Sequence, residues 1–187
     1  MEFIRLTDSN HTMYHQAMDL YKASFPIHEQ RESRVQTCIM GNEAYHFNLI
    51  YENNRWVGMI LCWETEEFIY IEHFCILPEM RGKKYGQKAL ELLGGERKTV
   101  ILEIDPPIDD VSVRRKRFYE RSGYQANRFA HVHPPYKKGF KGHDLVVMSS
   151  PDQLSEAEYR AFNSYLKSFG ICLIFRFTRK SQKTLVK

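Results

Sequence analysis

The alternation of apolar and polar residues predicts several strands in the first half of the chain. Residues 2–7 form a short apolar-rich segment, and residues 45–52 alternate between the two kinds, as a strand with one buried face does. Residues 55–65 are apolar on both faces, which is typical of a strand inside a covered sheet. A further strand is expected over 68–77, where Pro78 ends it.

Apolar residues spaced three and four apart predict helices between and after these strands. One helix is expected over 10–23, and a second, shorter one after the polar turn at 26–32. A third begins near Tyr85 and ends at a glycine pair. A fourth is expected over 112–122, because Gly123 is a natural left-handed cap.

The order of these elements predicts an α/β layered fold with a mixed sheet. Strands expected over 99–105, from Tyr124 onward and over 143–149 follow the helices and complete the sheet. We expect residues 1–150 to form one domain and residues 151–187 to be an addition to it.

The predicted addition begins with a helix. Ser155 and Glu158 have the spacing of a capping box, and Phe162, Tyr165, Leu166 and Phe169 would form its buried stripe. A last strand over 171–177 and a basic, frayed tail are expected after it.

Composition places the chain among ordinary globular proteins. It has 187 residues with 43% hydrophobic and 27% charged residues, and its formal net charge is +4. The weak positive charge suits an anionic ligand, but there is no recognition helix or aromatic and basic platform, so nucleic acid is not expected as a partner. The longest apolar stretch, residues 56–63, is too short to cross a membrane. With no signal-peptide pattern, we expect a cytoplasmic protein.

The four cysteines have no metal-ligand spacing and predict neither a disulfide framework nor a metal site. Three of them lie in apolar runs, so we interpret the cysteines as buried free thiols of a reducing compartment.

A candidate phosphate site lies where the strand over 68–77 runs through a glycine-containing loop into a helix. Backbone N–H groups at a helix N-terminus, together with the helix dipole, attract an anion. Gly82 and Gly86 let an anion approach the backbone, and Arg81, Lys83 and Lys84 add positive charge. The spacing excludes a Walker loop and a dinucleotide fingerprint. The alternative is a turn with a solvated basic face.

The segment 71–86 resembles the signature of GNAT acetyltransferases, which is a strand, a proline and Arg/Gln-x-x-Gly-x-Gly/Ala opening a helix. Arg81 and Gly86 match the ends of this motif, whereas Lys84 replaces its usual first glycine. Residues 117–124 resemble the family's Phe/Leu-Tyr-x-x-x-Gly-Phe element, with Ser112 in place of the usual asparagine. The resemblance covers residues 1–150. It implies a GNAT-like mixed central sheet with helices on both faces, here followed by a C-terminal helical extension.

This resemblance also implies acetyl-CoA as cosubstrate and assigns roles to residues. The backbone of Phe74 and Ile76 would bind the pantetheine arm like an added strand. Tyr119 would be the acid that protonates the leaving thiolate; the alternative is a core aromatic residue. The residues expected to bind the rest of the cofactor are Arg81, Gly82, Lys83, Lys84, Tyr85, Gly86 and Ser112.

Two neighbouring residues are candidates for the base that takes the proton of the acceptor amine. Glu72 interrupts an apolar strand, and a buried carboxylate away from cations would have a raised pKa. His73 is the second candidate, since its ordinary pKa suits the task. In a regular strand the two point to opposite faces, so only one would face the substrate. A water relay, or a structural role for both, stays open.

The acceptor pocket is expected to involve Glu29 and the loop 131–136, with His133 and Tyr136 as substrate-binding residues. Similar Phe-Pro-x-x-Glu and His-x-Pro-Tyr stretches occur in some small bacterial-type GNAT proteins. The alternative is an exposed turn and a surface loop. His131 and His133 have no evident third ligand, so no metal is expected.

The expected activity is acetyl transfer to a primary amine by direct attack in a ternary complex. The acceptor would be a small molecule or a peptide, and the protein a monomer or homodimer. The alternatives are a non-catalytic acyl-CoA-binding sensor and, through the basic tail, a nucleic-acid-binding protein.

Overall fold

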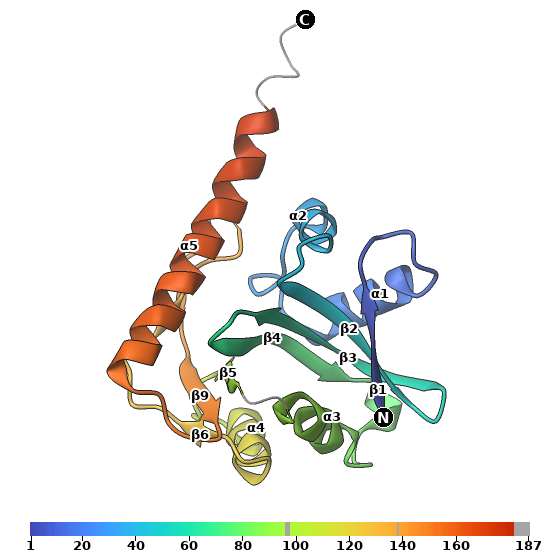
Figure 1. Cartoon of the computed structure of the whole chain (residues 1–187), viewed down its shortest axis with the longest axis vertical. Coiled ribbons are helices and arrows are strands. Elements are labelled where there is room, and N and C mark those ends of the chain that lie inside the picture. Colours follow the sequence, from blue (N-terminus) through green and yellow to red (C-terminus); the bar gives the residue numbers. More distant parts are fainter. Residues whose placement is uncertain (96–97, 138, 182–187) are drawn as a thin grey trace, which may run out of the picture.

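The computed structural model describes residues 1–95, 98–137 and 139–181, and these form a mixed α/β structure around one large sheet (Figure 1). The sheet has seven strands in the order β1-β2-β3-β4-β5-β9-β6. Only β4 and β5 are parallel neighbours; the other pairs are antiparallel. The strands of this sheet are β1 (Glu2–Leu6), β2 (Tyr45–Glu52), β3 (Arg55–Glu64), β4 (Phe68–Ile76), β5 (Thr99–Ile104), β6 (Gln125–Ala126) and β9 (Val146–Ser150). A separate ribbon pairs β7 (Val132–His133) with β8 (His143–Asp144).

Helices cover both faces of the sheet, as expected from the sequence (Figure 1). One face carries α1 (Tyr14–Ser24), α2 (Ser33–Ile39) and the first half of α5 (Glu156–Ser181). The other carries the short turn η1 (Pro78–Met80), α3 (Tyr85–Gly94) and α4 (Asp110–Arg121). Each face has its own apolar core, and β3 contributes to both, because successive side chains of a strand point to opposite sides.

Local sequence signals set the ends of the last two helices. Asp109 begins α4 by accepting hydrogen bonds from the backbone N–H of Val111 and Ser112, each 2.8 Å long. Gly123 follows the helix with φ +89°, a conformation that costs glycine little. The expected capping box of α5 is formed, since the backbone N–H of Ser155 donates to Glu158 Oε2 at 2.7 Å.

The region where β4 and β5 separate positions the functional site. Their parallel pairing runs from Phe68↔Thr99 to Ile71↔Leu102 and stops there, although both strands continue. On its other side, β4 has an extra residue, because Leu61 pairs with His73 and Cys62 with Ile71. Glu72 therefore lies in a β-bulge, which bends a strand and increases its twist. The bent strand diverges from β5 and opens a cleft.

The strand expected over 171–177 was wrong, because α5 continues through these residues to Ser181. A short, mostly apolar run fits a helix as well as a strand, and the preceding capping box had already started a helix that no proline interrupts. The second half of α5 extends away from the sheet (Figure 1). The end of the basic tail, residues 182–187, lies outside the described residues.

The interpretation of all cysteines as buried thiols was also wrong, since Cys38 is exposed on α2 while Cys62 and Cys75 are buried. Within the described part of the chain, no helix combines the length and the apolar character that a membrane crossing requires.

Candidate functional site

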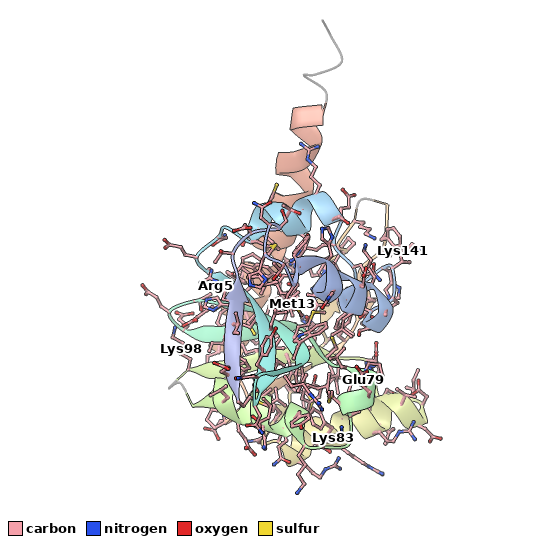
Figure 2. The ribbon with its side chains drawn as sticks, turned by 90° about the vertical axis from the view of Figure 1, so that its right-hand side faces the viewer. Arg5, Met13, Glu79, Lys83, Lys98 and Lys141 are labelled. Carbon is pink, nitrogen blue, oxygen red and sulfur yellow. The ribbon has the colours of Figure 1, made fainter. Side chains whose placement is uncertain are left out.

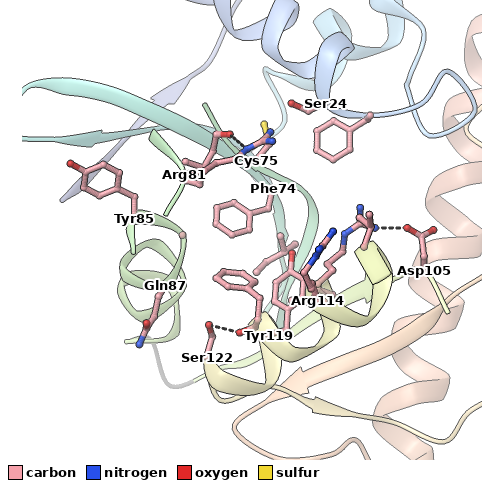
Figure 3. A pocket seen from close by; sticks show the side chains of 18 of the residues that line it. Ser24, Phe74, Cys75, Arg81, Tyr85, Gln87, Asp105, Arg114, Tyr119 and Ser122 are labelled. Atoms are coloured by element: carbon pink, nitrogen blue, oxygen red, sulfur yellow. Dashed lines mark hydrogen bonds and ion pairs between the residues drawn. The ribbon is translucent and has the colours of Figure 1, made fainter. Parts of the chain in front are cut away.

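A cleft of about 1080 Å³ opens between the diverging strands (Figure 3). One of its walls is formed by the end of β4 and the loop leading to α3, and another by α4. The segment after α1 closes it at one end through Phe25, Pro26, His28 and Glu29. In Figure 3, Phe74 points into the space between α3 and α4.

The loop before α3 has the backbone that an anion site needs. Gly82 has φ +75°, and Lys84, the N-cap of α3, has φ +61°. Lys84 thus adopts the left-handed conformation that glycine takes most easily, although it is a lysine. Because the helix begins directly after it, the N–H groups of its first turn lie at the cleft.

The expected cofactor residues divide into those that line the cleft and those that do not. Lys83 is exposed and contacts Met80 Sδ through Nζ at 3.8 Å; it does not line the cleft (Figure 2). Ser112 is buried in the capping box of α4, where its Oγ accepts from Asp109 N–H at 3.1 Å, and it also does not line the cleft. Its side chain is too short to leave this interaction for the cleft. The expected residues that line it are Phe74, Ile76, Arg81, Gly82, Lys84, Tyr85 and Gly86.

Gly86 is favoured by close packing as well as by approach of a ligand. A Cβ at this position would lie 3.1 Å from Phe118 Cζ and 3.6 Å from Phe74 Cζ. Two aromatic rings therefore lie beside the first turn of α3, and a side chain at this position would require the Phe118 ring to move by a few tenths of an ångström.

Tyr119 lies in the cleft wall on α4 and is 9% exposed. Burial raises the pKa of Tyr119 to about 12, which keeps its hydroxyl protonated at neutral pH. Its ring contacts Phe118 and Tyr124 at centroid distances of 5.1 and 5.8 Å. Cys75 also lines the cleft, and burial raises the pKa of its thiol to about 11.

Glu72 forms a buried bidentate ion pair with Arg31, which the sequence argument did not foresee. Arg31 Nη1 donates to Glu72 Oε2 at 2.5 Å, Nη2 donates to Oε1, and both side chains are 3% exposed. Trp63 Nε1 donates to the same carboxylate at 3.1 Å. Burial alone would raise the pKa of Glu72, but Arg31 and His73 hold it far below its ordinary range.

The reasoning that made Glu72 a base was therefore wrong in its premise, since the carboxylate is not away from cations. A carboxylate with a strongly lowered pKa is a weak proton acceptor at neutral pH. The expectation that Glu72 and His73 point to opposite faces was also wrong. The bulge at Glu72 shifts the alternation, and His73 Nδ1 lies 3.7 Å from Glu72 Oε2.

His73 is buried beneath the segment that follows α1. Its Nε2 lies 3.0 Å from the backbone oxygen of Glu29 and 3.4 Å from Tyr21 Oη. Tyr21 Oη in turn accepts from the backbone N–H of Arg31 at 3.0 Å. These contacts fasten the loop that carries Glu29 and Arg31 onto β4.

A second buried charged cluster surrounds Glu103 on β5. Its carboxylate pairs with His131 Nε2 and accepts from Tyr70 Oη at 2.5 Å, and His133 Nε2 lies 3.7 Å away. Burial opposes ionisation of Glu103, but the histidines and Tyr70 lower its pKa. The alternative of a surface loop at 131–133 was wrong for both histidines. Each is 4% exposed, because its ring lies beside the buried Glu103 carboxylate.

A small cavity of about 60 Å³ adjoins the large cleft at its acceptor end. His133 and Tyr136 line it with their rings stacked at 4.6 Å, as does His73. Glu29 lines both the cavity and the cleft. The structure thus brings the three expected acceptor residues together, although only Glu29 reaches the large cleft.

Two charged residues of this region, Glu103 and Arg31, were not predicted from the sequence to belong to the site. Glu103 interrupts an apolar strand just as Glu72 does, so the same signal could have found it. Arg31 had no such signal, because it lies in a polar turn and its burial depends on chain folding. Among the residues that the structure describes, no group of three histidine, cysteine or acidic side chains has the arrangement of a metal site.

Comparison with known proteins gives one consistent match. The model of the acetyltransferase (GNAT) family matches residues 10–124. The curated Bacillus subtilis (strain 168) protein "Putative acetyltransferase YjbC" is 25% identical over 104 residues, which cover 54% of this chain. The match spans about half the length of that relative, 52%.

Solved structures extend the match to nearly the whole fold. A structure described as "Putative acetyltransferase from GNAT family from Bacteroides thetaiotaomicron" has a TM-score of 0.83 and 28% identity, covering 89% of this chain and 96% of its own. An aminoglycoside 6'-N-acetyltransferase complexed with coenzyme A has a TM-score of 0.56 at 14% identity, covering 80% and 96%. The latter similarity concerns the fold alone.

Proposed function

Because the chain belongs to the GNAT acetyltransferase family, we propose that it transfers the acetyl group of acetyl-CoA to a primary amine by direct attack in a ternary complex. One observation supports this most strongly. A strand edge left open by the divergence of β4 from β5 and an anion site at the N-terminus of α3 face the same cleft. An extended thiol-bearing arm with a pyrophosphate at its other end fits such a cleft.

The cofactor would lie along β4 with its pyrophosphate at α3. The backbone of β4 from Glu72 to Ile76 has no β5 partner in the described ladder, so it can pair with an extended amide-containing chain. Arg81 Nε donates to the oxygen of Ile76 at 3.1 Å, which ties the loop to the strand end. The backbone N–H groups after Lys84 would bind the phosphate oxygens, and Arg81 and Lys84 would add charge.

Tyr119 is proposed as the acid. Its hydroxyl stays protonated at neutral pH and lies in the cleft wall with Cys75 and Phe74, next to the proposed path of the thiol. The phenol would give its proton to the sulfur as the carbon–sulfur bond breaks.

The acceptor end favours a cationic amine. Glu29, Glu72, Glu103 and Asp105 all line it, whereas Arg115 is the one lysine or arginine that lines both the cleft and the small cavity among the described residues. A small molecule or a peptide with a primary amine is the proposed acceptor, and its protonated form would be attracted to this end.

Two measurements test the proposal. Acetyl-CoA should raise the melting temperature, because a ligand that binds only the folded state stabilises it. Thiol release should then appear with at least one member of a panel of primary amines that includes polyamines, amino sugars and peptides. Acetyl-CoA binding without thiol release across the panel would favour the non-catalytic sensor. Absence of binding at millimolar acetyl-CoA would refute both.

A further inference from the structure

Five residues line both the cleft and the small cavity, and all five are charged: Glu29, Glu72, Glu103, Asp105 and Arg115. They form the junction between the two spaces. An amine that reaches the thioester from the acceptor end must pass or rest against this junction, so a proton acceptor for the amine is to be sought among its four carboxylates.

Two of these carboxylates are committed to buried partners. Glu72 is held by Arg31 and Trp63, and its side chain is 3% exposed. Glu103 is held by Tyr70 and His131 and is 4% exposed. Protonating either would disrupt buried contacts of the carboxylate with its partners, which is strongly unfavourable.

The third carboxylate, Asp105, pairs with the guanidinium of Arg115 at the cleft edge. Both side chains are 45% exposed. Asp105 therefore already has a cationic partner, with which it forms an ion pair at the edge of the cleft (Figure 3).

Glu29 differs from the other three. Its side chain is 25% exposed, and the contact of its carboxylate within the described residues is with Nε2 of the exposed His28, 3.6 Å away. Burial first, and the nearby Asp105 charge second, raise the pKa of Glu29. It is therefore the junction carboxylate whose protonation relieves a cost and breaks no buried ion pair.

The loop holds Glu29 in place through its backbone. The Glu29 N–H donates to the oxygen of Pro26 at 2.9 Å, and its carbonyl oxygen lies 3.0 Å from His73 Nε2. Two residues further along the chain, Arg31 is held in place by its ion pair with Glu72. A side chain on a fixed backbone, whose contact within the described residues is with an exposed histidine, can meet a substrate without disrupting a buried pair.

We propose that Glu29 is the general base of the acetyl transfer, with His73 and Arg31 as positioning residues of its loop. This inference rests on the proposed function. Glu29 takes one proton from the ammonium of the acceptor. The neutral nitrogen attacks the thioester carbon, a carbon–nitrogen bond forms and the carbon–sulfur bond breaks. Tyr119 protonates the sulfur and regains a proton from the attacking nitrogen. The products are the acetamide, CoA thiol and one proton, which leaves from Glu29.

Other charged and titratable groups lie near Glu29 and could also contribute to the pH dependence of acetyl transfer. His28 lies on the same loop as Glu29. The titratable or charged groups of other elements that line the small cavity with Glu29 or contact its backbone are Tyr21 on α1, Tyr70, Glu72 and His73 on β4, Glu103 and Asp105 around the end of β5, Arg115 on α4, and His133, Tyr136 and His143.

The test compares Glu29→Gln with Glu32→Gln, a matched change at an exposed residue of the same loop that lines neither space. The probe is the fastest amine of the panel, with CoA thiol release followed across pH. Glu29→Gln should lower kcat about 100-fold near neutral pH while acetyl-CoA affinity is unchanged. Its acidic limb should move to the higher pH at which the free amine loses its own proton. Glu32→Gln should match the wild type.

The possible failures are distinguishable. An active wild type with the same pH profile in Glu29→Gln would overturn the base role and leave the transferase intact. A wild type that releases no thiol with any amine would overturn the proposed function and this inference with it. If Glu29→Gln does not fold, ¹³C-carboxyl NMR of the wild type decides. Titration of Glu29 at or below the ordinary glutamate range would then refute the proposal, and titration above it would support it.

Discussion

The two ends of the cleft are built in different ways. The end of the cleft proposed to hold the cofactor is mainly one continuous segment, in which β4 leads through η1 and the loop into α3, and the groups proposed to bind there are backbone atoms. The acceptor end brings together Arg31 and Glu72, which lie 41 positions apart, and Glu103 and His131, which lie 28 apart. Its groups are buried charged side chains.

This difference predicts which kind of substitution disrupts each end of the cleft. A backbone site tolerates many side-chain changes but not a change of shape, such as an added Cβ at Gly86. A buried ionic network tolerates few changes, because each charge depends on its partner for compensation. We therefore expect mutations in the buried ionic network to act on folding, and mutations at the proposed cofactor end to act on binding.

The largest effect is expected at the buried ion pair. Arg31→Met removes the partner of Glu72 and should lower the free energy of unfolding by about 3–5 kcal/mol, since an uncompensated charge is left buried. Urea unfolding measures this loss. Arg34→Met, an exposed change on α2, is the control. The double variant Arg31→Met/Glu72→Met should regain most of the loss, and purely additive losses would contradict the network.

The second effect is catalytic and leaves packing intact. Tyr119→Phe keeps the ring contacts with Phe118 and Tyr124 but removes the hydroxyl. Turnover should fall about 100-fold with little change in acetyl-CoA affinity. Tyr124→Phe removes a neighbouring hydroxyl that does not line the cleft and should leave turnover unchanged. Equal rates for both variants would make Tyr119 a core residue only.

The third effect tests the cofactor end. Gly86→Asp should weaken CoA binding about 30-fold, because the added carboxylate would lie at the helix N-terminus and repel the phosphates of CoA. Calorimetry with CoA measures the loss. Gly41→Asp, at a glycine with open space around it, should bind CoA normally. Wild-type affinity in a folded Gly86→Asp variant would place the phosphates elsewhere.

The smallest effect concerns Lys84. Lys84→Gly relieves a left-handed backbone and should raise the free energy of unfolding by about 0.5–1 kcal/mol in chemical denaturation. Lys84→Ala removes the same charge but keeps the strain, so any gain should be absent there. A drop in CoA affinity shared by both variants would measure the contribution of the lysine charge. A loss of stability in Lys84→Gly would show that the conformation carries no strain.

The sequence predicted the sheet and its helices because periodicity and end signals are local. The alternation in residues 45–52, the Gly123 cap and the Ser155 capping box each act within a few residues, and the structure has each of them. The 171–177 segment shows the limit of the same reasoning, since an apolar run has no period of its own.

The sequence by itself determined the cofactor end, because a strand, a glycine loop and a helix N-terminus follow one another along the chain. Only the tertiary structure decided the acceptor end. One extra residue in β4 turned Glu72 and His73 to the same side, and folding of the 25–31 loop buried Arg31 beside that carboxylate. The pKa of a carboxylate depends on what lies within a few ångströms of it, and sequence position does not fix that distance. For the same reason Glu29, unlike Glu72, is a junction carboxylate whose contact, with His28, lies at the exposed surface.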